Sequence, residues 1–439
     1  MLLAWWMTDA HAADASPAGS LSTVLVLLAV VGSAYLLTHF VVERAQQRFL
    51  FVSGLEYVVL GVLLGPHALP QIQPFADLTR LAPVFAFAAG WVGLLYGLDA
   101  RSAPVEARPL RIAVLDAVVT GVVVTAAAHW WFQAGLVAPP APPREAWSTA
   151  ILLGCAAAAG SSSAVELLQS RYGQLATRLL PLLKRTSRFG DLVAIGAFGL
   201  VFCWFHQGTT LTAEPVGPRE WFVLTVGLGV VLGWLFAMFL GDDRSENSVF
   251  LAMVGTLLLA SGAAFFLNLS AVFVNLVLGL VLAQTRFGDQ LRTQLEQTAK
   301  PARLVLLLFA GSQWRPVPLV PAALVVLGFL GLRMLAKVVA SAVGTAGTPL
   351  RADLFRGLIA QGDVAVAMAL SFRLVYDGPT VDLAYTAVLV SVAVSELIGP
   401  RMLRGLLVDA GELGQDLGPV PSASPASIAA TAPAAPERS

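Results

Sequence analysis

Apolar stretches of about the length that crosses a lipid bilayer follow one another along almost the whole chain. A membrane-spanning helix needs about 20 mainly apolar residues. Only 12% of the residues are charged, whereas a soluble domain carries roughly twice that share. About thirteen such stretches can be counted, with short polar connections between them. The chain is therefore predicted to be an all-α polytopic membrane protein.

Three regions follow from this pattern. Residues 1–20 contain a short apolar run and small residues, and we interpret them as an extracytoplasmic lead-in, with a cleaved signal peptide as the alternative. Residues 21–405 form the transmembrane domain. Residues 406–439, rich in Ala, Pro and Ser, are predicted to be a disordered cytoplasmic tail, with no soluble regulatory domain after the membrane part.

The distribution of Lys and Arg indicates an orientation. One alternate set of connections holds only Arg80, Arg144, Arg219 and Arg315, whereas the other set and the C-terminal flank are densely basic. Cytoplasmic loops are the ones enriched in Lys and Arg. We therefore expect the N-terminus outside, the C-terminus in the cytoplasm and an odd number of spans in a cell inner (plasma) membrane. The basic connection 171–188 is predicted to be an interfacial helix.

Several classes of protein are disfavoured. Cys155 and Cys203 both lie in apolar segments, where they are typical of small hydrophobic residues. We find neither a zinc-binding cluster nor a GxxxxGK[ST] or GxGxxG motif for a nucleotide. Formal net charge is zero, which argues against nucleic acid as a partner. We expect no cofactor and no enzymatic activity.

One carboxylate is out of place in this apolar background. Asp191 lies in RFGDLVAIGAFGLVF, which otherwise has the composition of a membrane-buried helix. A charged group at bilayer depth costs several kcal/mol, so it normally faces water, a counter-charge or a transported ion. Asp191 is therefore the leading candidate for an ion-binding and proton-binding residue.

Two cations are similarly buried. Arg333 and Lys337 are four residues apart in one apolar stretch, so they share a helical face. We expect both to act as counter-charges, with Asp191 as the best-placed acidic partner. A structural ion pair that only holds two helices together is the alternative.

Two further segments carry polar groups where lipid-facing sequence has none. GSSSAVELL contains Ser161, Ser162 and Ser163, and IAQGDVAVAMAL contains three further candidates, Gln361, Gly362 and Asp363. Either the small residues allow close packing of intact helices, or the helices are interrupted and their freed carbonyls line an ion cavity. Two such segments, one in each half of the chain, favour interrupted helices in inverted repeats.

Other polar residues in or near the spans are weaker candidates. Glu56, Asp116, Glu166 and Glu396 are interpreted as residues near helix ends or paired with neighbours. His39, His129 and His206 lie close to predicted span ends and are interpreted as interfacial residues rather than proton relays.

Seven segments also match a known pattern, in the same order: VVLGVLLGPHAL, GSSSAVELLQ, RFGDLVAIG, FLNLSAVFVNLVLGLVLAQT, LLLFAGSQW, GFLGLRMLAK and AQGDVAVAMAL. From residue 21 to about Arg404 the chain resembles the monovalent cation:proton antiporters, closest to the Kef-type potassium-efflux branch. The resemblance implies two crossing, interrupted helices in a core bundle beside a scaffold that forms a homodimer. It places Asp191 at the family's ion-binding aspartate, Arg333 at a basic residue that pairs with it, and Asp363 at a second acidic position.

The chain departs from this family pattern at several positions. Gly190 stands where the family has Gln, Asn or Asp, which is similar to the one-carboxylate arrangement that the family associates with electroneutral exchange. Ser162 and Ser163 stand where sodium-selective relatives often have Thr-Asp, so potassium and sodium both remain candidates. Glu166 is an additional charge.

These observations lead to two functional hypotheses. The first is a secondary active transporter that exchanges a monovalent cation, K⁺ or Na⁺, for protons by alternating access, with Asp191 holding either the transient cation or a proton. The second is an antiporter-like fold that acts as a channel or a sensor without coupled exchange. A membrane enzyme has little support, because no nucleophile–base pair or metal motif lies at a membrane face.

Overall fold

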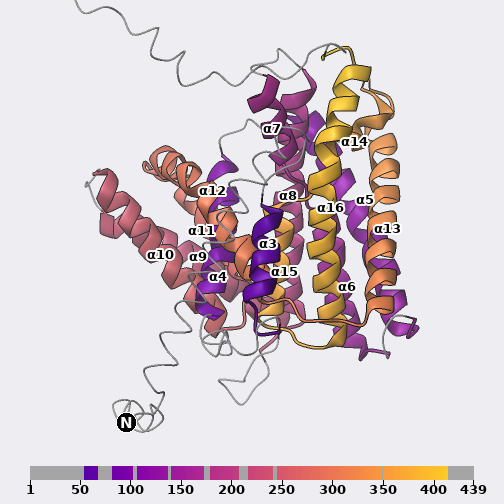
Figure 1. Ribbon diagram of the computed structural model, residues 1–439. Coiled ribbons are helices and arrows are strands. Elements are labelled where there is room, and N and C mark those ends of the chain that lie inside the picture. The colour runs from indigo at the N-terminus through magenta and orange to yellow at the C-terminus, as the bar shows by residue number, and fades with distance from the viewer. Residues whose placement is uncertain are drawn as a thin grey trace, which may run out of the picture.

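The chain folds into two bundles of helices, and in the residues that the structure describes all regular secondary structure is helical (Figure 1). This computed structural model describes residues 54–67, 82–101, 106–136, 140–172, 178–206, 216–240, 245–348 and 350–413. The expected lead-in 1–20, the expected first span and the tail beyond residue 413 lie outside the described residues.

One bundle, which we call the scaffold bundle, contains α3 (Leu55–Leu64), α4 (Ala82–Asp99), α9 (Pro218–Leu240), α10 (Glu246–Phe266), α11 (Ala271–Leu282) and α12 (Gly288–Ser312). Its central contact is between α4 and α11, where glycines let the backbones meet. A Cβ atom at Gly93 would lie 2.0 Å from the carbonyl oxygen of Val272, so a larger residue would push the two helices apart.

The other bundle, which we call the core bundle, contains two interrupted helices among longer ones. Its elements are α5 (Ala107–Gln133), α6 (Pro143–Ala158), α7 (Ser163–Tyr172), α8 (Leu179–Trp204), α13 (Leu319–Thr345), η4 (Ala352–Leu354), α14 (Phe355–Leu358), α15 (Asp363–Arg373) and α16 (Pro379–Asp409). The pairs α6/α7 and α14/α15 are the two interrupted helices.

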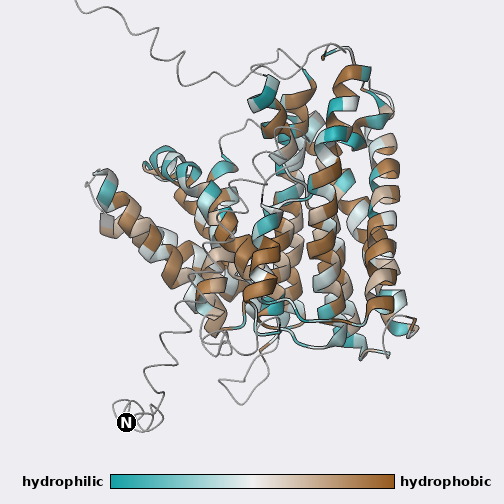
Figure 2. Ribbon diagram, viewed as in Figure 1, coloured by the Kyte–Doolittle hydropathy of each residue, from teal (hydrophilic) through white to brown (hydrophobic). Residues whose placement is uncertain are grey.

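The dimensions and the polarity of the helices fit a multi-pass membrane protein. In the described part, eight helices are long and apolar enough to cross a membrane, and the pair 352–358 and 363–373, bent by 61°, makes a ninth span. Apolar residues cover the middle of the helices, and polar residues collect at both ends of the molecule (Figure 2). Large apolar side chains such as Phe239 and Leu319 are 79% and 83% exposed, as expected for surfaces that face lipid.

The two ends differ in charge. The end that holds α7 and α14, at the top of Figure 1, carries Arg171 on α7 and Arg356 on α14. We call it the basic end. α6 and α16 both begin at the other end, where Glu145 accepts a hydrogen bond from Thr380.

The boundaries of three helices differ from the pattern of apolar stretches. The basic stretch 179–188 is the start of α8 rather than a separate interfacial helix. Helix α12 begins at Gly288, well before the apolar part of its sequence, because the polar residues 289–300 continue the helix at the basic end. Helix α16 runs from Pro379 to Asp409, so it continues a few residues past position 405, where the transmembrane domain is expected to end.

Candidate ion-binding site

The first interrupted helix breaks at residues 159–162, between the end of α6 and the start of α7. Ser161 Oγ accepts a hydrogen bond from the main-chain N–H of Ser163 at 3.1 Å and so caps the first turn of α7. The break is buried, so its main-chain groups need partners inside the protein. The sequence prediction of an interrupted helix at these serines is confirmed.

The second interrupted helix breaks at residues 359–362 and meets the first break. A Cβ atom at Gly362 would lie 2.6 Å from Ser161 Oγ, so only glycine allows this approach. Gln361, fully buried, joins the same region: its Nε2 donates to the carbonyl of Ala156 at 2.6 Å, and Ser391 Oγ donates to its Oε1 at 2.7 Å. The sequence had indicated Gln361 and Gly362 as neighbours of a break, and both lie there.

Asp191 on α8 faces this crossing and is 1% exposed. Its Oδ1 accepts a hydrogen bond from the main-chain N–H of Gly160 at 2.8 Å. Its Oδ2 has no hydrogen-bond partner among the described residues. The Tyr96 hydroxyl of α4 lies close enough to interact with the carboxylate, although it makes no hydrogen bond of ordinary length to Oδ2, and Asp363 and Lys337 lie within electrostatic range. One oxygen is thus held by the break, and the other can bind a cation or a proton.

The two buried cations do not pair with Asp191 as expected. Arg333 donates to the carbonyl oxygens of Ala157 at 3.1 Å, Ile359 at 2.8 Å and Ala159 at 3.4 Å. It therefore satisfies the carbonyls that both breaks leave open, and the guanidinium neutralises the negative ends of α6 and α14. The expected pairing of Arg333 with Asp191 was wrong, because the guanidinium N–H groups donate to carbonyl oxygens at the helix ends instead.

Lys337 pairs instead with Asp116 of α5, with Nζ 2.7 Å from Oδ2. Both groups are buried, so this ion pair joins α13 to α5 inside the core bundle. The sequence indicated Asp116 only as a weak candidate, because residue spacing within one helix does not show which other helix packs against it.

The remaining candidates, Asp363, Ser163 and Ser162, do not all face the buried crossing. Asp363 is the first residue of α15, where the positive end of the helix faces its carboxylate. Ser163 donates to the carboxylate of Glu396 on α16, at 3.1 Å from each oxygen. Ser162 points elsewhere: its hydroxyl donates to Glu166, at 2.9 Å, on the more exposed side of α7.

Glu396 is the residue that sequence reasoning underestimated. It is 3% exposed, and Arg303 of α12 donates to its Oε1 at 2.8 Å. The signal that could have found it was a lone glutamate late in an apolar stretch, the same signal that identified Asp191.

A small cavity of about 20 Å³ lies beside the site, between α4 and α8. Tyr96, Asp99, Arg188 and Leu192 are among its lining residues. Arg188 Nη1 is 2.7 Å from Asp99 Oδ2, so an ion pair between the two bundles borders the cavity. No group of three or more His, Cys, Asp or Glu side chains that could hold a metal ion occurs in the described ranges.

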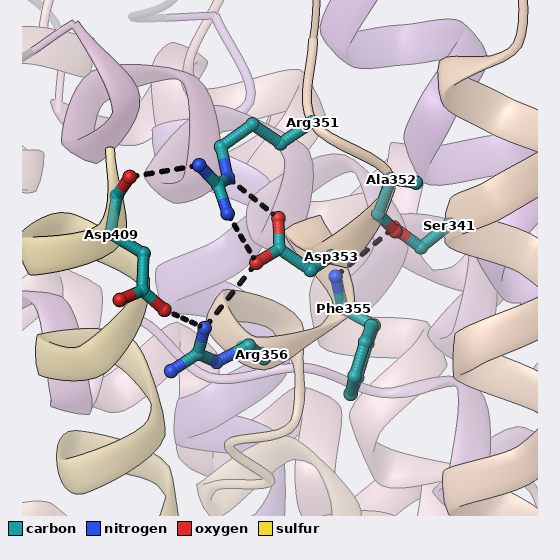
Figure 3. A network of polar contacts seen from close by, with 7 residues as sticks. All are labelled: Ser341, Arg351, Ala352, Asp353, Phe355, Arg356 and Asp409. Atoms are coloured by element: carbon teal, nitrogen blue, oxygen red, sulfur yellow. Dashed lines mark hydrogen bonds and ion pairs between the residues drawn. The ribbon is translucent and has the colours of Figure 1, made fainter.

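A polar network at the basic end fixes the first half of the second interrupted helix (Figure 3). Arg351 donates to Asp353 at 2.9 Å and to the main-chain carbonyl of Asp409 at 2.8 Å, and Arg356 donates to the Asp409 carboxylate at 2.5 Å. Ser341 of α13 accepts from the main chain of α14 and donates to that of η4. These contacts all lie within the core bundle, so the broken helix, α13 and α16 are held as one unit.

Two interrupted helices that cross beside a buried carboxylate are the arrangement of ion-coupled secondary transporters. The family model for the sodium/hydrogen exchanger transmembrane domain matches residues 33–408, and the chain belongs to this family. Its members are transporters rather than enzymes. The expected superfamily is confirmed, and the assignment to the Kef-type branch stays a prediction.

A solved structure shows the same fold. The sodium proton antiporter MjNhaP1 from Methanocaldococcus jannaschii at pH 8 aligns with a TM-score of 0.56 and 17% sequence identity. The alignment covers 86% of this chain and 99% of that one. No curated protein matches the sequence significantly.

Proposed function

We propose that this protein exchanges a monovalent cation, Na⁺ or K⁺, for protons at Asp191 by alternating access. The observation that supports this most directly is the state of the Asp191 carboxylate. It is buried at the crossing of the two breaks, one oxygen accepts a main-chain N–H, and the other has no partner among the described residues.

The exchange follows from competition for that second oxygen. When Asp191 is ionised it binds a cation, and when it is protonated its negative charge is lost and the cation is released. Hydroxyls of Ser161 and Ser163, together with polar groups around Gln361 and Gly362, complete the coordination of the cation in this proposal. Asp363 adds negative charge near the site. Arg333 neutralises the partial charge of the helix ends, and Lys337 neutralises Asp116.

Movement of the core bundle against the scaffold bundle would carry the occupied site from one side of the membrane to the other. The contacts of Figure 3 hold the core bundle together during such a movement. We further propose that the scaffold bundle forms a homodimer, that the N-terminus is outside and the C-terminus cytoplasmic, and that the protein acts in a cell inner membrane. The asymmetric distribution of Lys and Arg supports this orientation.

The test is transport by the full-length protein in sealed vesicles with a pH-sensitive dye inside. Addition of Na⁺ or K⁺ should release protons from acid-loaded vesicles, and the Asp191→Asn variant should show no cation-dependent release. Asp377→Asn, which neutralises an exposed loop aspartate, is the matched control and should retain exchange. Full exchange by Asp191→Asn would refute the assignment, and comparison of the two cations gives the selectivity.

A channel or sensor is the second candidate, and Gly190 favours it. Where the family pattern has a polar side chain before the aspartate, this chain has none. The space beside Gly190 is open, since a Cβ atom there would meet nothing within 4 Å. A channel predicts downhill cation flux without proton counterflow, and a sensor predicts no flux. The same vesicle assay, with cation flux recorded beside the proton signal, separates both from an exchanger.

A further inference from the structure

A continuous chain of polar contacts runs from the crossing of the breaks to the scaffold bundle. Ser161 Oγ donates to Ser163 Oγ at 2.7 Å, and Ser163 Oγ donates to the Glu396 carboxylate. Arg303 on α12 donates to the same carboxylate at 2.8 Å. The chain thus joins α7, α16 and α12, and its last link connects the core bundle to the scaffold bundle.

The direction of each hydrogen bond in this chain is determined by chemistry. Arg303 has only N–H donors and donates to Glu396 Oε1, and Ser163 Oγ lies 3.1 Å from both carboxylate oxygens, so Ser163 is the donor in its contact with this acceptor group. The lone pairs of Ser163 are then available to Ser161, whose hydroxyl hydrogen points to Ser163. Both hydroxyl hydrogens are directed toward Glu396 and away from the crossing.

This direction matters for cation binding. Ser161 Oγ lies against Gly362 at the point where the breaks meet. It uses one lone pair to accept the Ser163 N–H and keeps the other. A cation is attracted to an oxygen lone pair and repelled by a hydroxyl hydrogen, so a serine pair oriented by Glu396 presents the favourable side.

We propose that Glu396 is a positioning residue that orients Ser161 and Ser163 for cation binding, and that Arg303 makes this orientation depend on the relative position of the two bundles. The inference rests on the proposed exchange function. When the core bundle moves, the Arg303–Glu396 contact must lengthen, and the serines lose their fixed direction. Release of the cation is thereby favoured once the site has moved.

The test compares Glu396→Gln with wild type in the vesicle assay. A glutamine can donate as well as accept, so it no longer forces the serine hydrogens in one direction. The KM for the cation should rise about tenfold, as expected for loss of one hydrogen bond to a charged group, while kcat changes less. Glu396→Asp, which retains the charge, should partly restore the KM.

A double-mutant cycle with Ser163→Ala separates orientation from general stability. Because Glu396 acts through Ser163, adding Glu396→Gln to Ser163→Ala should not raise the KM further, and the combined variant should have the KM of Ser163→Ala rather than the product of both changes. Asp377→Asn is the control: it also removes an Arg-paired carboxylate, but one that is exposed in the loop before α16 and contacts neither serine, and its KM should equal that of wild type.

Glu396→Gln leaves the half-buried Arg303 without its carboxylate partner. If this variant does not fold, Arg303→Gln/Glu396→Gln is the second variant, and the same tenfold rise is expected. A KM within twofold of wild type for these variants, or independent effects of Glu396→Gln and Ser163→Ala, would overturn the inference. The proposed exchange function has a separate test, the Asp191→Asn variant. It would fail if that variant still exchanged ions, and it is not affected by a negative result at Glu396.

Discussion

The main-chain N–H of Gly160 donates a 2.8 Å hydrogen bond to Oδ1 of Asp191, which joins α8 to the first break. An N–H that is free to point sideways exists there only because α6 has ended and α7 has not begun. The break therefore does two things: it exposes main-chain groups inside the membrane part, and it holds the carboxylate in one orientation.

Gly160→Ala should impair exchange strongly. A Cβ atom at this position would lie 2.5 Å from Ser187 Oγ and 3.4 Å from Ser187 Cβ, so the break or the Ser187 side chain must shift, and we expect the N–H to move away from Asp191. We expect at least a tenfold loss of kcat/KM, since about 1.5–3 kcal/mol is typical for a hydrogen bond to a charged group. Ser187→Gly in the same chain should relieve the clash and restore much of the activity, and failure of this rescue would contradict the steric explanation.

Gly190→Ala should stabilise the protein. Gly190 lies inside α8, and a Cβ atom there meets no neighbour within 4 Å. Replacing a helical glycine by alanine without a clash typically stabilises by about 0.5–1 kcal/mol. Thermal unfolding in detergent measures this change, and a lowered midpoint would show that the space around Gly190 is needed by the fold.

Lys337→Met should destabilise the core bundle more than the double variant Asp116→Asn/Lys337→Met. The two groups form a buried ion pair at 2.7 Å, and removal of one partner leaves an uncompensated charge that costs about 3–5 kcal/mol. Neutralising both residues leaves no uncompensated charge, so the double variant should be the more stable of the two. Denaturant unfolding in detergent compares them, and equal stability of the single and double variants would show that Asp116 is compensated by another group.

Asp377 should contribute a small pH dependence to stability. It lies in the loop between α15 and α16, where the hydrogen bond from Arg373 holds the pKa of its carboxyl below its ordinary value. A lowered pKa in the folded state stabilises the protein above the pKa of the unfolded chain, about 3.9. This stabilisation is lost as the pH falls through the folded value.

The comparison with Asp377→Asn measures this contribution. The difference in unfolding temperature between wild type and variant should be constant from pH 7 to about pH 5 and should shrink toward pH 3. The effect is small because the side chain is 68% exposed and water screens the pair. A difference that grows with acidification would reverse the sign and contradict the assignment.

Several parts of the site were predictable from the sequence, because the free-energy cost of a polar residue inside a membrane depends mainly on that residue and its own segment. A carboxylate in RFGDLVAIG and serines after a glycine in GSSS stand out against apolar neighbours whatever the helices around them do. The positions of both breaks, and of Gln361 and Gly362 beside the second one, were obtained in this way. The role of these groups as ligands stays a prediction.

The partners of the buried charges were not predictable. Lys337 pairs with Asp116, Glu396 with Arg303, and Arg333 with three carbonyls, across sequence separations from 26 to 221 residues. Helical spacing tells which residues share a face, but not which helix that face meets. The extension of α12 to Gly288 was missed for a related reason: a polar helix outside the apolar layer has no apolar stretch to mark it.

The sequence by itself determined the class of protein, the positions of the interruptions and the presence of a buried carboxylate at position 191, because the bilayer penalises each polar residue individually. Only the tertiary structure decided how charge is distributed around that carboxylate. Packing brings the ends of α6 and α14 together, and these ends bind Arg333 and leave one oxygen of Asp191 without a partner among the described residues. Such a balance depends on distances between helices, which no single segment encodes.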